Sequence, residues 1–299
     1  MKKLHTHPSL EKLAQECREW LEQAQAKRKA EQAEAAIQKF LDMPGELDPK
    51  AGLQLDRLAL YFDVASCDGF FRSDTEDLSR LIQHAVQLRA LVFRWDAMYS
   101  DMRQDLGNWP REFSDSMKAM GPSMLSWWGQ ASTCAQLYIE MAEKDQRINT
   151  MPEMRKVKNA TSDVFAVELF STHFNIPTCF KPLKPLIPEY QAVLDAWNTV
   201  DEVKFQALMQ MAADFHISRS KENTDRTRYE FDATIDRVFP AELLAIQALR
   251  RKHHLPEFEA DHALIDTPWK VLREIKSVDV HPLAKAVEER LIKDYPQFR

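Results

Sequence analysis

The stretch Leu78–Leu106, LSRLIQHAVQLRALVFRWDAMYSDMRQDL, decides the fold of this 299-residue chain. Apolar side chains recur every seven residues in it along two rows. The rows consist of Leu78, Ala85, Val92, Tyr99 and Leu106, and of Leu81, Leu88, Trp95 and Met102. Because no Pro or Gly interrupts this heptad spacing, it predicts one long helix. We expect the helix to begin near Ser73, whose hydroxyl can cap it.

More apolar side chains lie beside these rows, so the predicted helix is apolar on more than one face. They are Ile82, Val86, Leu91, Phe93 and Met98. A helix of this kind is usually central, with neighbours on several sides. The same rows could instead form the seam of a coiled-coil dimer, an alternative that the sequence leaves open.

The rest of the chain favours helix as well. It contains only six Gly, and its long Gly-free segments are rich in good helix formers. The sequence therefore predicts an all-α fold of about ten to twelve helices, in two packed halves around the long central helix. The halves are residues 1–145 and 146–299, which together form one compact unit, and the polar segment Lys144–Ala160 joins them.

Local sequence signals predict one turn and the start of one later helix. Cys67-Asp68-Gly69 is expected to turn the chain into the central helix. A later helix is expected to open at Thr199, with Glu202 at the spacing of a capping box. Its expected inner stripe is Val200, Val203, Ala207, Leu208, Met211, Ala212 and Phe215.

Charge excludes one class of function and suggests another. The formal net charge of −6 argues against a general nucleic-acid binder, which needs a basic face. Between Asp42 and Asp77 there are nine acidic residues against three basic ones. This segment is either an ordinary solvated surface or a docking surface for a basic partner.

Cysteine usage and the N-terminus indicate where the protein acts. The four Cys are far apart and form no C-x-x-C motif, as is typical of reduced thiols. No apolar run follows Lys2 and Lys3, so we expect neither a signal peptide nor a transmembrane span. The sequence predicts a cytoplasmic protein that does not associate with a membrane.

Known motifs of catalysis and metal binding are missing. A di-metal carboxylate bundle needs two Glu-x-x-His pairs, and the chain offers only Glu259 with His262. No G-x-S-x-G surrounds a serine, and the glycines form no phosphate-binding loop. We therefore expect no enzyme, no catalytic residue, no metal site and no cofactor.

One part of the chain resembles a known family. The resemblance rests on the Asp201–Phe215 helix with Phe205-x-Ala207-Leu208, on His216, on the charged segment Arg219–Arg237, on Leu243-Leu244-Ala245-Ile246 and on Pro268-Trp269-Lys270-Val271-Leu272. From Ala192 to about Leu272 this layout resembles the all-helical immunity proteins of bacterial polymorphic toxin systems, above all the type catalogued as immunity protein 49. The immunity family paired with PoNe-type DNase toxins is a second match. Either resemblance implies a non-enzymatic cytoplasmic protein that binds and blocks one toxin domain.

The expected partner is a cognate toxin domain of basic charge. An adaptor or scaffold without a toxin partner is the alternative, and self-association into a homodimer stays open. The acidic residues expected to contact the partner are Asp56, Asp63, Asp68, Asp74 and Asp77, with Glu222, Asp225, Glu230, Asp232 and Asp236 as the second choice.

Overall fold

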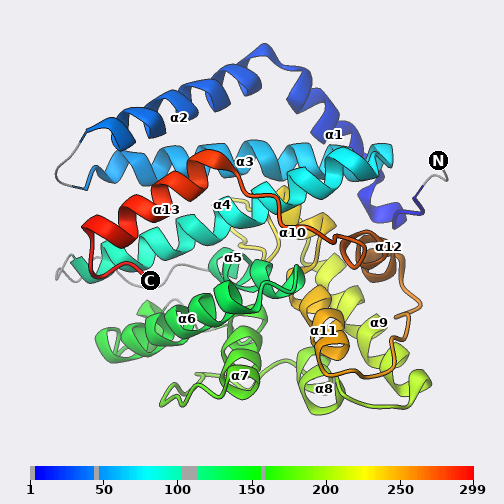
Figure 1. Cartoon of the computed structure of the whole chain (residues 1–299). Coiled ribbons are helices and arrows are strands. Elements are labelled where there is room, and N and C mark those ends of the chain that lie inside the picture. The colour runs from blue at the N-terminus through cyan, green and yellow to red at the C-terminus, as the bar shows by residue number, and fades with distance from the viewer. Residues whose placement is uncertain (1–3, 44–46, 103–112, 156–158) are drawn as a thin grey trace. The chain divides into compact units, whose positions relative to one another are not determined.

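The computed structural model describes residues 4–43, 47–102, 113–155 and 159–299. This described part contains thirteen α-helices and two short 3-10 turns, and no strand occurs in it (Figure 1). The all-α prediction is confirmed, with a helix number close to the expected one. Packing divides the chain into a first unit, Met1–Gln104 with Glu274–Arg299, and a second unit, Asp105–Arg273. These boundaries differ from 1–145 and 146–299, and Lys144–Ala160 falls inside the second unit.

The first unit combines the N-terminal helices with the last helix of the chain. Its helices are a 3-10 turn at Pro8–Leu10, α1 (Glu11–Glu22), α2 (Ala24–Asp42), α3 (Pro49–Arg72), α4 (Thr75–Met102) and α13 (Pro282–Asp294). The helix α3 packs against α1, α2 and α4, while α13 packs against α2 and α4 (Figure 1). The C-terminus is therefore part of the N-terminal fold.

The helix α4 supplies the core of the first unit, as its heptad rows predict. Most row members, among them Leu88 and Trp95, are buried within the unit, whereas Met102 is exposed and Leu106 lies outside the described residues. The Trp95 ring lies 5.5 Å from the ring of Phe40 in α2. A Cβ built on Gly52 of α3 would lie only 2.6 Å from Trp95 Nε1. Because α3 and α13 cover the rows, α4 serves as a core helix of its own unit.

The boundary between α3 and α4 differs from the expectation. Ser73 ends α3 in a left-handed conformation with φ 60°, and its Oγ accepts a hydrogen bond from the Leu4 N–H. The expected turn at Cys67–Gly69 lies inside α3. The helix α4 begins at Thr75, close to the expected start, but Ser73 ends α3 and does not cap α4. The expected turn was wrong because Cys67 and Asp68 are buried. Tertiary packing extends the helix past a local turn signal.

The second unit is organised around α11. Its helices are α5 (Phe113–Met124), α6 (Trp128–Ile148), a 3-10 turn at Pro152–Met154, α7 (Ser162–Phe174), α8 (Pro188–Ala196), α9 (Glu202–Ser218), α10 (Thr234–Val238), α11 (Ala241–Lys252) and α12 (Ala263–Leu272). Every residue of α11 from Ala241 to Arg250 is buried. This helix packs against α5, α9 and α12.

The helix α9 corrects the expected inner stripe. Leu208 and Ala212 are buried, but Val200, Val203, Ala207 and Met211 are exposed. The observed inner face contains Phe205, Leu208, Met209, Ala212, Ala213 and His216. The helix is capped by Asp201, whose carboxylate accepts the Lys204 N–H at 3.0 Å, so the cap lies two residues after the expected Thr199. Apolar residues lie on both faces of α9, and periodicity alone chose the wrong one.

Candidate functional site

Two of the acidic residues predicted to contact the partner, Asp63 and Asp68, have buried side chains in the first unit. Asp63 is buried, and its Oδ2 accepts a hydrogen bond from Arg89 of α4 at 2.9 Å. Asp68 is also buried, and its Oδ2 accepts one from Arg72 Nε at 2.7 Å. A buried carboxylate is stable only when it is paired. The Asp63 pair joins α3 to α4, whereas the Asp68 pair lies within α3. Their role as partner contacts stays a prediction.

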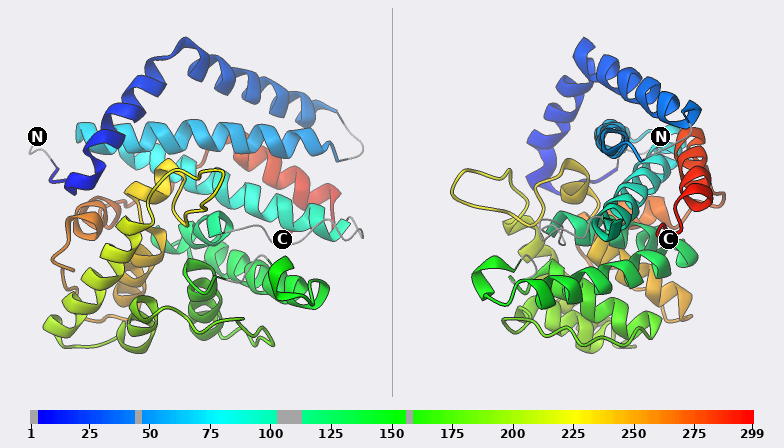
Figure 2. Two further views of the ribbon diagram at one scale, coloured as in Figure 1. Left: turned by 180° about the vertical axis from the view of Figure 1, so that it is seen from behind. Right: turned by 90° about the vertical axis from the view of Figure 1, so that its left-hand side faces the viewer.

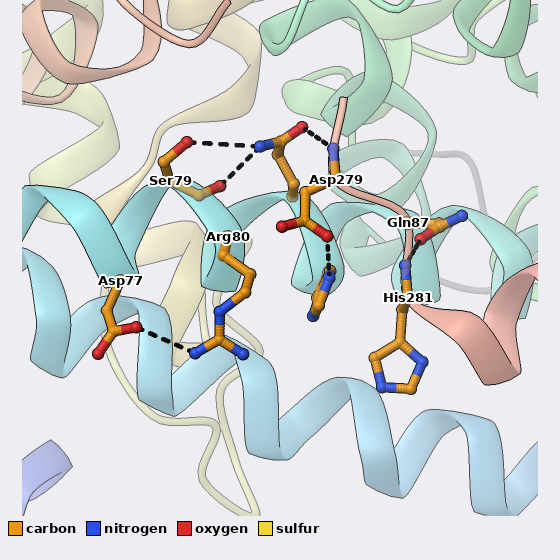
Figure 3. Close-up of polar contacts among 8 residues, drawn as sticks. Asp77, Ser79, Arg80, Gln87, Asp279 and His281 are labelled. Atoms are coloured by element: carbon orange, nitrogen blue, oxygen red, sulfur yellow. Dashed lines mark hydrogen bonds and ion pairs between the residues drawn. The ribbon is translucent and has the colours of Figure 1, made fainter. Parts of the chain in front are cut away.

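The other three predicted acids of the first unit do not form one cluster with them. Asp74 is half-buried and lies 3.7 Å from Arg72 Nη1. Asp77 is exposed and pairs with Arg80 at 3.0 Å (Figure 3). Asp56 is exposed on α3, about 18 Å along the helix from Asp68. The acidic residues near the start of α4 and Asp56 are thus separate surface features.

Four of the five second-choice acids belong to the loop 219–233 between α9 and α10 (Figure 2, yellow). Glu230 is buried and pairs with Arg219 at 2.5 Å, and Asp236 is buried in α10. Asp232 is half-buried and accepts a hydrogen bond from the Asn223 amide. The exposed charged residues of the loop are Lys221, Glu222, Asp225, Arg226 and Arg228. This exposed part carries more positive than negative charge, unlike the acidic contact that the sequence suggested.

A different surface of the first unit combines an acid with apolar anchors. We define the α3 face as Leu53, Asp56, Arg57, Leu60 and Tyr61. Leu53 is 51% exposed and Leu60 is 48% exposed, although both are large apolar side chains on a well-packed helix. Their spacing of seven residues places them on one side of α3 with Asp56 between them. The Tyr61 ring also lies 6.4 Å from that of half-buried Trp20 in α1.

Sequence reasoning singled out Asp56 and missed its apolar neighbours. The inner side of α3 contains Leu55, Leu58, Ala59 and Phe62, which are all buried. The available signal was that Leu53 and Leu60 fall outside this inner stripe and repeat at a heptad distance. An off-stripe pair of leucines around a carboxylate could have marked the α3 face.

A polar contact between α4 and the segment before α13 was also missed. The Gln83 side-chain oxygen accepts the Asp279 N–H at 2.9 Å, and that of Gln87 accepts the His281 N–H at 2.8 Å (Figure 3). Gln83 also donates to the Ser79 carbonyl at 2.9 Å. Two glutamines one helical turn apart thus bind an extended backbone in the way a neighbouring strand would. The signal was the presence of polar residues in a helix that is otherwise apolar on several faces.

Two histidines pack against each other at this contact. The rings of His84 and His281 lie 5.0 Å apart, and each also lies edge-to-face with Phe62. His84 Nε2 lies 3.1 Å from Asp279 Oδ1. Burial lowers the pKa of His84, with Asp279 opposing the effect, and burial together with His84 lowers the pKa of His281 to about 4. Both rings are therefore neutral near pH 7, and their aromatic packing helps to hold the segment on α4.

The second unit buries its own polar centre. Glu242 of α11 accepts a hydrogen bond from Tyr190 Oη at 3.1 Å and lies 2.6 Å from His216 Nδ1. The His216 ring stacks on Phe231 with 3.7 Å between centroids. Burial, followed by the charge of Glu242, raises the pKa of Tyr190 well above its usual value. This contact links α8, α9, α11 and the loop 219–233 around one carboxylate.

These arrangements bind chain segments to one another. Within the residues that the structure describes, no group of three or more His, Cys, Asp or Glu is arranged to hold a metal ion. The four Cys, all in the described ranges, form no disulfide, with Cys17, Cys67 and Cys134 buried and Cys179 exposed. No helix in the described ranges has the length and apolarity that crossing a membrane requires. The α3 face is the candidate functional site, because its side chains are presented to solvent.

Comparison with known proteins finds no similar protein. No protein-family model matches the chain, and neither a curated protein nor a solved structure gives a match.

Proposed function

We propose that this chain is an immunity protein that binds a cognate bacterial toxin domain in the cytoplasm and neutralises it. The toxin domain is a basic protein, and the inhibitor acts by stoichiometric binding without chemistry of its own. The resemblance of residues 192–272 to helical immunity proteins suggests the class. The α3 face is the observation on the molecule that supports a binding role.

The α3 face has the composition of a protein-binding surface. Stable interfaces depend on a few large side chains that lose water on binding, surrounded by a polar rim. Leu53 and Leu60 offer such anchors, and the neighbouring Tyr61 and Trp20 belong to residue types that contribute strongly at interfaces. Exposed apolar side chains grouped on one helix face need an explanation, and a partner is the simplest one.

Charge explains why the partner is basic. The chain has a net charge of −6, and Asp56 lies between the two anchors of the α3 face. An acidic binder attracts a basic domain from a distance and so raises the association rate. The exposed residue Asp77 and half-buried Asp74 extend the acidic surface near the start of α4.

Co-expression in a sensitive host tests this function. The resemblance implies that the toxin is encoded next to this chain. Cells that produce the product of the neighbouring gene should therefore die when this chain is absent and survive when it is present. The complex should purify with equal amounts of the two proteins. If survival is the same with and without this chain, the immunity function is wrong.

The same experiment separates the adaptor alternative. An adaptor should recover several proteins of its own cell and give no protection, whereas an immunity protein should recover one toxin and protect.

A further inference from the structure

The outer face of α9 presents a continuous apolar stripe to solvent. We define the α9 stripe as Val200, Val203, Ala207 and Met211. Val200 is 72% exposed, Val203 is 74% exposed and Met211 is 40% exposed. The spacing of four residues places Val203, Ala207 and Met211 on one side of the helix, and Val200 precedes the Asp201 cap. The opposite side is packed inside the second unit, so the stripe is a second apolar surface of this helix.

Two residues of opposite charge, Lys204 and Asp214, lie along the same side of α9 as the stripe. Asp214 is exposed, and its ion-pair partner in the described part of the chain is His262 at 3.7 Å. Lys204 is exposed, and no carboxylate of the described residues lies within ion-pair distance of its Nζ. The stripe therefore has a basic residue near one end and an acidic residue near the other.

We infer that the α9 stripe binds the same stripe of a second copy of this chain, with the two helices antiparallel and Ala207 at the two-fold axis. Val203 and Met211 each lie four residues from Ala207, about 6 Å along the helix in opposite directions. An antiparallel pair therefore places Val203 of one copy against Met211 of the other. The small Ala207 side chain at the centre lets the two helices approach closely.

The charges of Lys204 and Asp214 favour the antiparallel arrangement over a parallel one. Antiparallel pairing brings Lys204 of one copy to within about 6 Å, along the helix axis, of Asp214 of the other. The four-carbon side chain of lysine spans that distance, and the two-fold symmetry forms the pair twice. A parallel pair would instead place Lys204 against Lys204. The stripe and its charges are thus self-complementary.

The expected dimer is weak. A single helix from each copy forms an interface near the lower limit for specific association, so we expect dissociation on dilution through the micromolar range, with Kd on the order of micromolar. Sedimentation equilibrium at several protein concentrations measures this directly. The inference is wrong if the chain stays monomeric at all concentrations up to ~1 mM. A Kd of that size corresponds to a binding free energy of only about −4 kcal/mol.

Cross-linking tests the position of the axis. Ala207→Cys in a Cys179→Ser background should form an intermolecular disulfide on mild oxidation, because a residue on a two-fold axis meets itself. The matched control is Glu202→Cys, an exposed position that faces away from the stripe. Equal cross-linking of the two variants, or none at position 207, contradicts the arrangement.

Charge exchange tests the pairing. Lys204→Asp should raise the dissociation constant about tenfold, and the combined variant Lys204→Asp/Asp214→Lys should restore it, because the pair re-forms with its charges reversed. Lys204 and Asp214 are both exposed, so the far-ultraviolet spectra of the two variants should stay unchanged. If the double variant dimerises more weakly than Lys204→Asp alone, the antiparallel pairing is wrong. If Val203→Glu leaves the dissociation constant of the dimer unchanged but abolishes protection against the toxin, the stripe binds the toxin and a second copy does not occupy it.

Discussion

The two central helices, α4 in the first unit and α11 in the second, bury arginine in different ways. In α4, Arg89 pairs with the buried carboxylate of Asp63 at 2.9 Å, and Arg94 pairs with Glu288. In α11, Arg250 donates to the carbonyls of Trp197 at 2.5 Å, Thr199 at 2.9 Å and Pro256 at 2.8 Å. Its guanidinium also lies 4.2 Å from the centre of the Phe205 ring.

The difference shows what each arginine fixes. An arginine that pairs with a carboxylate on another helix joins two helices, and both partners can be exchanged together. An arginine that binds three carbonyls fixes the path of two loops, and no single exchange replaces it. Burial lowers the pKa of Arg250, because the charge has left water without a carboxylate partner. The predictions below break one arrangement at a time, from the largest expected effect to the smallest.

Asp63→Ala should have the largest effect on stability. It removes the buried carboxylate that pairs with Arg89, which should cost about 3 to 5 kcal/mol of unfolding free energy. The double variant Asp63→Leu/Arg89→Met removes both charges and should recover most of that loss. Urea unfolding of the two variants measures the difference. If the double variant is no more stable than the single one, the ion pair does not explain the burial of these residues.

Arg250→Met should cost about 2 to 4 kcal/mol, because the carbonyls of Trp197, Thr199 and Pro256 lose a charged donor. Arg250→Lys should recover little of it, since one ammonium group cannot reach all three carbonyls with the geometry of a guanidinium. Unfolding midpoints of both variants provide the measurement. A fully stable lysine variant would show that charge alone, without the planar fork, is sufficient.

Gly52→Ala tests how closely α3 approaches α4. The added methyl group would lie 2.6 Å from Trp95 Nε1, so it should destabilise the first unit by about 1 to 3 kcal/mol. Adding Trp95→Phe should relieve part of the clash. The control is Gly129→Ala in α6, where nothing lies within 4 Å and no loss is expected. Equal unfolding midpoints of the two alanine variants would contradict the close contact.

His281 should make the stability of the first unit depend on pH. The pKa of His281 is about 4 in the folded chain, below the ordinary value of 6.5, so the unfolded chain binds more protons in between. This contribution to stability is complete above pH 6.5 and is lost as the pH falls toward 4. His281→Phe keeps the ring packing with Phe62 and removes the titration. The variant should lose about 1 to 2 kcal/mol less than the wild type between pH 7 and 4. Identical pH profiles would exclude His281 as a source of acid sensitivity.

Local periodicity predicted the part of the fold that local sequence determines. The heptad rows of α4 identified a core helix, because burial on several faces leaves a pattern within one segment. The return of α13 to the N-terminal helices was not predictable, because it depends on contacts such as those of Gln87 with His281 and Arg94 with Glu288. The choice of inner face in α9 failed for a related reason. Both faces of that helix are apolar, and packing against neighbouring helices decided between them.

The candidate site was predictable only in part. The acidic segment drew attention to Asp56 and Asp63 together, since seven residues separate them on one helix. Arg89 of α4 pairs with Asp63 and leaves Asp56 at the surface, a distinction that needs the position of the next helix. Charge patterns show where acids occur in a sequence, and burial decides which of them meet a partner.

The central claim is that the α3 face binds the toxin, and the most direct test is whether a chain with an altered α3 face still protects cells. Cells co-expressing the toxin should survive with the wild-type chain and die with the variant Leu53→Ser/Asp56→Lys/Leu60→Ser, because it removes both anchors and reverses the charge. The matched control, Ile292→Ser/Glu31→Lys, changes an exposed apolar residue and an exposed acid elsewhere in the first unit and should protect fully. Far-ultraviolet spectra and unfolding midpoints should be the same for all three chains. Full protection by the folded α3-face variant would contradict the proposed binding site.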